Sequence, residues 1–177
     1  MNFTHLHVHS HYSLLTALPK IEDLFAEAKA LGMTALAITD TNAMYGAVEF
    51  YTKAKDYGIK PIIGAEIFVC KDLHSKNNTA EDRRRHQLVL LVKNETGYKN
   101  LMKIISIAQL EGFYYKARAD KNLLRQYGEG LIALSGSMQG EVPSEIIYGN
   151  YERAKEIALE YQEIFDQGNF YLELGPH

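Results

Sequence analysis

Short apolar runs alternate with amphipathic patterns along this chain, and this alternation constrains its fold more than any other feature. Apolar runs bounded by turn residues predict strands at 34–39, 60–69, 86–92, 130–135 and 170–174. Apolar residues at helical spacing predict helices at about 19–31, 45–57, 96–108, 122–127, 143–148 and 150–165. Strands that alternate with helices imply an α/β fold with a parallel sheet, either doubly wound or closed into a barrel.

The boundaries of these elements lead to three further expectations. Thr96 is the expected N-cap of the long helix, and Gly64 marks a possible interruption of the strand at 60–69. The stretch 71–85 is polar, with paired asparagines and three arginines. We expect it to be an exposed loop, and it is the one candidate for disorder inside the chain.

Four histidines occupy every second position of the N-terminal stretch FTHLHVHSHYS: His5, His7, His9 and His11. This is the period of a strand, so an extended stretch would place all four imidazoles on one side. Neutral imidazole is the commonest transition-metal ligand, and two of them two residues apart can reach a single ion. The alternatives are a polar strand end with its histidines in water, or an expression remnant.

Other polar residues follow the predicted strands. In a parallel sheet the C-terminal ends of the strands lie together, and sites are built there. The residues at those ends are His7, His9, Asp40, Glu66, Ser135, Ser137 and His177. Asp and Ser after a strand can equally cap the next helix. His86 begins its strand and in a parallel sheet would lie on the far face, so either that strand runs against the others or the predicted boundary is wrong.

Length and charge limit the function classes. The chain has 177 residues, enough for one domain with a sizeable core. Its net charge of -3 and pI near 6.2 do not predict a protein that binds nucleic acid by itself. Cys70 is the only cysteine, which suits a reducing compartment. Neither a signal peptide nor an apolar run of membrane-spanning length is visible, so we expect a soluble cytoplasmic protein.

Several long stretches resemble one family. They are HLHVHSHYSLL, LAITDTNAMYGAVEFYTKAKDYGIKPIIGAE, LVLLVKNETGYKNLMKIIS, EGFYYKARADKNLL, EGLIALSGSMQGEVP and FYLEL. In this order they are similar to the polymerase and histidinol phosphatase (PHP) domains that begin bacterial DNA polymerase III alpha subunits. The resemblance implies a single PHP domain over 1–177, with a distorted (β/α)7 TIM-like barrel truncated here after about the sixth strand.

Family members with intact sites hold up to three zinc or manganese ions. The resemblance implies that His7, His9, Glu66 and His86 are metal ligands in this chain. Thr41 stands where intact members have a histidine, Ser137 where a cysteine is usual, and Thr16 where an aspartate is common. The family's last ligands, an Asp-x-His, lie beyond His177. We therefore expect at most one weakly held zinc or manganese ion and no efficient nuclease.

The resemblance also implies a functional setting. The parent protein would be a DNA-directed DNA polymerase active in DNA replication, whose polymerising carboxylates lie outside this chain. Its partners would be the rest of the alpha subunit, replisome subunits including a proofreading exonuclease, and DNA through the parent protein, with no membrane. We expect a structural or docking role. The alternatives are an active metal-dependent 3′–5′ exonuclease or phosphoesterase, and a free-standing enzyme like histidinol phosphatase.

Basic residues are candidates for contacts with phosphate. Arg83, Arg84 and Arg85 form one cluster, and a second group between positions 116 and 125 consists of Lys116, Arg118, Lys121 and Arg125. A run of charges is more often a solvated face.

Overall fold

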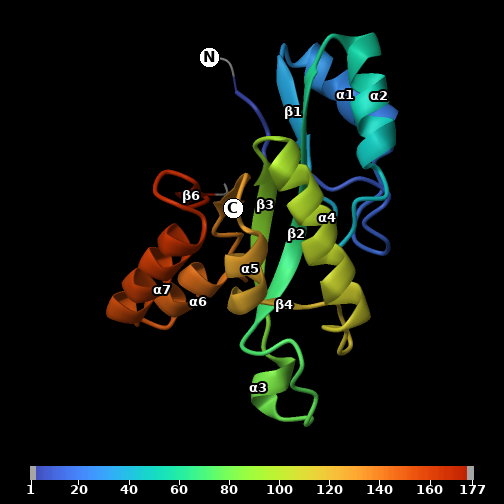
Figure 1. Ribbon diagram of the computed structural model, residues 1–177. Coiled ribbons are helices and arrows are strands. Elements are labelled where there is room, and N and C mark those ends of the chain that lie inside the picture. Colours follow the sequence, from blue (N-terminus) through green and yellow to red (C-terminus); the bar gives the residue numbers. More distant parts are fainter. Residues whose placement is uncertain (1–2, 175–177) are drawn as a thin grey trace. The chain divides into compact units, whose positions relative to one another are not determined.

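The computed structural model describes residues 3–174, in which helices alternate with strands (Figure 1). The helices are α1 (Ile21–Ala30), α2 (Ala47–Tyr57), α3 (Ala80–Arg83), α4 (Glu95–Leu110), α5 (Lys121–Tyr127), α6 (Glu141–Ile147) and α7 (Tyr151–Ile164). The strands are β1 (Ala35–Ile38), β2 (Lys60–Cys70), β3 (His86–Val92), β4 (Ala119–Asp120), β5 (Leu131–Leu134) and β6 (Phe170–Tyr171). The helices and strands expected between residues 19 and 174 are therefore confirmed in kind and order, while α3 and β4 were not expected.

The strands form a mixed six-stranded sheet, with hydrogen-bonded neighbours in the order β1-β2-β3-β5-β6 and β4 beside β2. β3 pairs with β5 in the antiparallel direction, so the expectation of a wholly parallel sheet is wrong. The segment between β2 and β3 contains only the four-residue helix α3, and not the long helix that usually connects parallel strands. β2 is continuous through Gly64, so the interruption expected there is absent.

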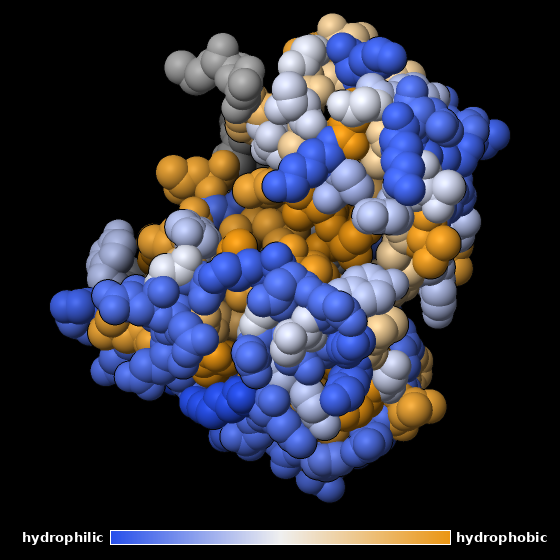
Figure 2. All heavy atoms as spheres, turned by 45° about the horizontal axis from the view of Figure 1, so that its top comes forward, coloured by the Kyte–Doolittle hydropathy of each residue, from blue (hydrophilic) through white to orange (hydrophobic). Residues whose placement is uncertain are grey.

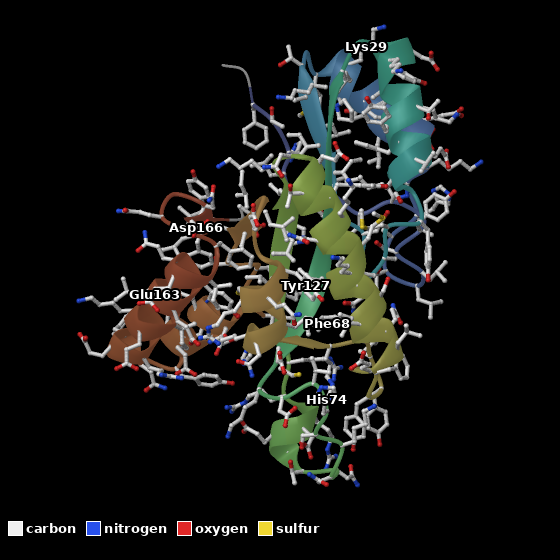
Figure 3. The ribbon with its side chains drawn as sticks, viewed as in Figure 1. Lys29, Phe68, His74, Tyr127, Glu163 and Asp166 are labelled. Carbon is white, nitrogen blue, oxygen red and sulfur yellow. The ribbon has the colours of Figure 1, made fainter. Side chains whose placement is uncertain are left out.

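The chain divides into two compact units, 1–66 and 67–177. In the first unit, β1 pairs in parallel with the start of β2, and α1 and α2 supply the apolar core. Phe25 and Phe50 are fully buried, with ring centroids 4.5 Å apart. α1 ends at Ala30, and the ammonium of Lys29 in its last turn (Figure 3) lies 5.9 Å from the centroid of the Tyr57 ring. Each helix buries one apolar face and exposes the other, which explains why the spacing of apolar residues predicted both helices from the sequence.

In the second unit, the end of β2 pairs in parallel with β4, and β5 pairs in parallel with β6. The buried residues of β3 and β5 form its centre, together with Leu101 and Ile104 of α4. The N-cap of α4 is Asn94, whose side chain accepts a 3.0 Å hydrogen bond from the N–H of Gly97. The expectation of Thr96 as N-cap is therefore wrong, because the helix starts earlier at Glu95. Figure 2 shows hydrophilic side chains over most of the lower half of that view.

The segment 71–85 is exposed at most positions, as its polar composition predicts, but it is not an irregular loop throughout. It contains α3, whose N-terminus is capped by a reciprocal capping box between Thr79 and Asp82. His74 is exposed on this segment (Figure 3), but Leu73 and Asp82 are buried. The reason lies forty residues away: the buried guanidinium of Arg118 donates hydrogen bonds to the carbonyls of Leu73, Ser75, Asp82 and Gly112.

The N-terminal histidine stretch is extended but does not form the regular strand that its alternation predicts. The N–H groups of Ala37 and Thr39 donate to the carbonyls of His5 and Val8, and a bend lies at His7. The N–H groups of Val8 and Ser10 bind side-chain oxygens, those of Thr39 and Asp40. Because side chains take these donors, no backbone ladder forms.

Candidate metal centre

His7, His9 and Glu66 bring their ligand atoms together in the first unit. The Oε2 atom of Glu66 lies 3.0 Å from Nε2 of His7 and 3.5 Å from Nε2 of His9. One ligand atom from each of the three residues lies within 4.8 Å of the others. Glu66 is only 2% exposed, while both imidazoles are partly open to solvent. This spacing suits three ligands of one metal ion.

The carboxyl of Glu66 is ionised in this setting. Burial acts to raise its pKa, but the hydrogen bonds and charges of His7 and His9 outweigh burial and lower the pKa to about 2. The carboxylate therefore presents a negative oxygen at neutral pH, as a metal ligand must.

A cation would improve the surroundings of a poorly satisfied atom at this centre. The Nε2 atom of His9 is buried, and among residues 3–174 it makes no hydrogen bond shorter than its 3.5 Å contact with Oε2 of Glu66. A buried polar atom with only a long contact of this kind is poorly compensated for its lost hydration. Two imidazoles and one carboxylate form a ligand set that zinc accepts, as do other first-row metals. The residues present thus fit a single ion.

Asp40 is buried beside the centre and is committed to other partners. Its Oδ1 accepts hydrogen bonds from the N–H of Ser10, at 2.7 Å, and from the hydroxyl of Ser13, at 2.6 Å. Its Oδ2 accepts from the hydroxyl of Ser10 at 2.8 Å. Asp40 is 1% exposed, so the structure places it as an anchor of the chain that follows His9.

Thr41 contacts Glu66 directly, a contact that the sequence did not suggest. Its hydroxyl donates a 3.2 Å hydrogen bond to Oε1 of Glu66, and the next residue, Asn42, donates its N–H to the carbonyl of Glu66. The only sequence signal for this role is the polar run Thr39-Asp40-Thr41 directly after a buried strand.

The other two histidines of the N-terminal stretch do not share the face of His7 and His9. His5 is exposed and lies against the ring of Phe3, with centroids 4.7 Å apart. His11 packs on the ring of Tyr12, with centroids 4.3 Å apart. The regular alternation that would place all four imidazoles on one side is broken by a bend at His7 and a turn at His11 and Tyr12, and within residues 3–174 only His7 and His9 belong to the converging ligand atoms.

The remaining predicted site residues lie in the second unit or outside the described residues. His86 begins β3 and lines a pocket of about 420 Å³ with charged residues that include Arg84, Lys121 and Glu141. Burial lowers the pKa of His86. The hydroxyl of Ser137 donates a 2.7 Å hydrogen bond to Oε1 of Gln87. The ligand role of His86 and the site role of Ser137 stay predictions, and His177 lies outside the described residues.

The basic residues offer fewer phosphate contacts than the sequence suggests. Arg83, Arg84 and Arg85 are exposed, but Arg118 is buried and bonded to backbone carbonyls. Lys121 pairs with Glu141 and Glu160, and Arg125 pairs with Glu160. Within residues 3–174, none of the helices is long and apolar enough to cross a membrane.

The family model of the PHP domain matches residues 5–177. The chain belongs to the PHP domain family. Among curated relatives, this PHP domain is 45% identical over 185 residues to a DNA polymerase III subunit alpha from Helicobacter pylori strain J99. It is 46% identical over 178 residues to the same subunit from Borreliella burgdorferi. Both alignments cover 99% of the chain and 15% of the relative. This PHP domain therefore spans about one seventh of the length of these relatives.

A solved structure supports the fold of this PHP domain. An amidohydrolase from Chromobacterium violaceum superposes with a TM-score of 0.51 at 14% sequence identity, covering 97% of this chain and 88% of that one. The likeness concerns the fold alone. The mixed α/β architecture is thus similar to TIM-like folds, while the strand count of the barrel and its truncation stay predictions.

Proposed function

We propose that this chain is the PHP domain of a DNA polymerase III alpha subunit, and that it serves the polymerase as a structural and docking domain. Identities of 45% and 46% to alpha subunits, along almost the whole chain, support this proposal. The proposal makes the chain part of a DNA-directed DNA polymerase that works in DNA replication. Its partners are then the rest of the alpha subunit and replisome subunits, including a proofreading exonuclease.

Within this role, the triad of His7, His9 and Glu66 holds one zinc or manganese ion. The convergence of these three ligands, with Nε2 of His9 buried and only 3.5 Å from Oε2 of Glu66, carries the proposal. The hydroxyls of Thr41 and Ser137, which stand at ligand positions of intact family members, already donate hydrogen bonds to other side chains. The centre is therefore degenerate compared with a site that holds several ions.

When bound, the ion supplies a positive charge that can polarise a phosphoryl oxygen or lower the pKa of water. The residues of the chain do the remaining work. His7 and His9 carry the N-terminal segment, and Glu66 lies in the middle of β2. An ion bound by all three ligands would link the N-terminal segment to β2, so the ion stabilises the folded domain.

The proposal is tested in the complete alpha subunit, with a His7→Ala and His9→Ala double variant. Purified without a histidine tag, the wild type should contain about one equivalent of zinc or manganese, and the variant should contain none. DNA synthesis by the variant should stay within about twofold of the wild type, and its thermal midpoint should fall. A variant that retains the metal would contradict the triad, and a wild type inactive in DNA synthesis would contradict the polymerase assignment.

One observation favours a second candidate function. A triad of two imidazoles and one carboxylate leaves a coordination position open for water, which is the arrangement of catalytic zinc sites. The second candidate is a metal-dependent phosphoesterase that removes nucleotides from a 3′ end. Its test is nucleotide release by the alpha subunit without its exonuclease partner. Release that disappears in Glu66→Gln would establish this activity, and its absence at all metal concentrations would favour the structural role.

A further inference from the structure

Three consecutive residues after β1 each hold a different part of the candidate metal centre. Thr39, Asp40 and Thr41 belong to neither the helix nor the strand around them, and all are buried or partly buried. None of them belongs to the group of converging ligand atoms. Their side chains nevertheless bind the segment that carries both histidines, and the carboxylate between them.

Thr39 fixes the residue between the two histidines. Its hydroxyl oxygen accepts a 2.8 Å hydrogen bond from the N–H of Val8, and its own N–H donates a 2.8 Å bond to the carbonyl of Val8. Both backbone groups of Val8 are therefore tied to one residue. This leaves little freedom for the peptide units that join His7 to His9.

Asp40 fixes the residue after the second histidine. Its carboxylate binds both the N–H and the hydroxyl of Ser10, and the hydroxyl of Ser13 as a third donor. Ser13 in turn accepts a 3.1 Å hydrogen bond from the N–H of Thr41, which closes a ring of contacts around the loop. Hydrogen bonds to a buried carboxylate are stronger than those between neutral groups.

Thr41 fixes the carboxylate itself. Its hydroxyl donates to Oε1 of Glu66, while Oε2 faces Nε2 of His7 at 3.0 Å. One oxygen of Glu66 is thus held by the threonine, and the other is left for the imidazoles or an ion. Partners of this kind, which touch a ligand and not the metal, orient ligands and tune metal affinity.

We infer that Asp40 and Thr41 are positioning residues of the metal centre, Asp40 through Ser10 and Thr41 through Glu66. The inference rests on the proposed function, in which the triad binds an ion. It also assigns Asp40 a role other than that of metal ligand, because three donors already occupy its two oxygens and its side chain is buried. The run Thr39-Asp40-Thr41 is then a frame around the ligands.

The first test compares zinc affinities of the full chain by competition with a chromogenic chelator. Thr41→Val keeps the shape of the side chain and removes the donor to Glu66, so zinc affinity should fall about tenfold or more. Thr41→Ser keeps the hydroxyl and should restore most of the affinity. The matched control is Thr52→Val, which removes a hydroxyl bonded to the carbonyl of Val48 on the exposed face of α2 and should change nothing.

Asp40 is tested with a readout that separates positioning from ligation. Asp40→Asn keeps one acceptor oxygen, so zinc X-ray absorption should report the same total coordination number, mean ligand distance and number of imidazole ligands as in the wild type. A changed coordination number or mean ligand distance in this variant would show that Asp40 binds the metal and would overturn the inference. Asp40→Ala should weaken zinc binding more than Asp40→Asn does. If Asp40→Ala does not fold, Ser13→Ala replaces it, since it removes one of the three donors.

A metal-free measurement separates this inference from the proposed function. Nitrogen-15 spectra of the imidazoles in the metal-free chain should show shifted His9 signals in Asp40→Ala or Ser13→Ala, and shifted His7 signals in Thr41→Val. Thr52→Val should leave both sets unchanged. If the wild type binds no ion but these shifts occur, the frame stands and the metal proposal falls. If imidazole signals and zinc affinity match the wild type in every frame variant, the inference is overturned.

Discussion

Glu66 Oε2 lies 3.0 Å from His7 Nε2, although the two residues are 59 positions apart in the sequence. The contact joins the start of the chain to the middle of β2, and it exists only when the first unit is folded. Ion binding at this point is therefore linked to folding, and any change that loosens the N-terminal segment should weaken the centre.

Arg118 should be among the most sensitive positions of the second unit. Arg118→Met removes the donors to four backbone carbonyls and leaves buried oxygens without partners. We expect the free energy of unfolding to fall by about 3 kcal/mol or more, measured by urea denaturation. Arg125→Met, at a half-exposed ion pair, serves as control and should cost less than about 1 kcal/mol. Equal effects of the two substitutions would contradict the assigned role of Arg118.

The contribution of Asp82 to the free energy of unfolding should depend on pH. Hydrogen bonds from Ser75 and from both the hydroxyl and the N–H of Thr79 lower its pKa from 3.8 to about 2. A carboxyl whose pKa is lower in the folded than in the unfolded state stabilises the fold at pH values above its unfolded pKa. This stabilisation is lost as the pH falls toward the folded pKa. The stability difference between the wild type and Asp82→Asn should therefore shrink between about pH 4 and pH 2. A difference that stays constant over this range, in denaturation curves at each pH, would refute this assignment.

Cys70 should be unreactive in the folded protein. Its side chain is buried, and burial raises the pKa of the thiol to about 11. Only the thiolate reacts readily with disulfide reagents, and little of it exists at pH 8. We expect slow labelling of the native chain and complete, fast labelling in denaturant. The rate is measured from the coloured thiolate that Ellman's reagent releases as it reacts. Fast labelling at pH 8 without denaturant would show that the end of β2 opens readily.

The order of helices and strands could be predicted because periodicity is local. The apolar stripes of α1 and α2 and the runs of β1 and β3 are each readable within a short window. The direction of β3 could not be predicted from a short window, because it depends on pairing with β5, a strand distant in sequence. The ordered state of residues 71–85 escaped prediction for a related reason, since it depends on Arg118, a residue distant in sequence.

Part of the candidate site was also within reach of the sequence. The alternating histidines and the strand-end position of Glu66 suggested a metal site, and the family resemblance selected His7 and His9 as the pair that binds with Glu66. The bend that separates His5 and His11 from this pair could not be predicted, because it depends on side-chain acceptors at Thr39 and Asp40. The role of Thr41 was hidden for the same reason: a hydroxyl reveals its partner only in the folded chain.

The most direct test of the metal centre is a calorimetric titration of the metal-free chain with zinc, in parallel with the His7→Ala and His9→Ala double variant. The wild type should bind one equivalent, release protons as the ligands bind, and melt at a higher temperature when loaded. The double variant should show none of these responses. Equal binding by the two proteins, or no binding by the wild type, would contradict a metal centre formed by His7, His9 and Glu66.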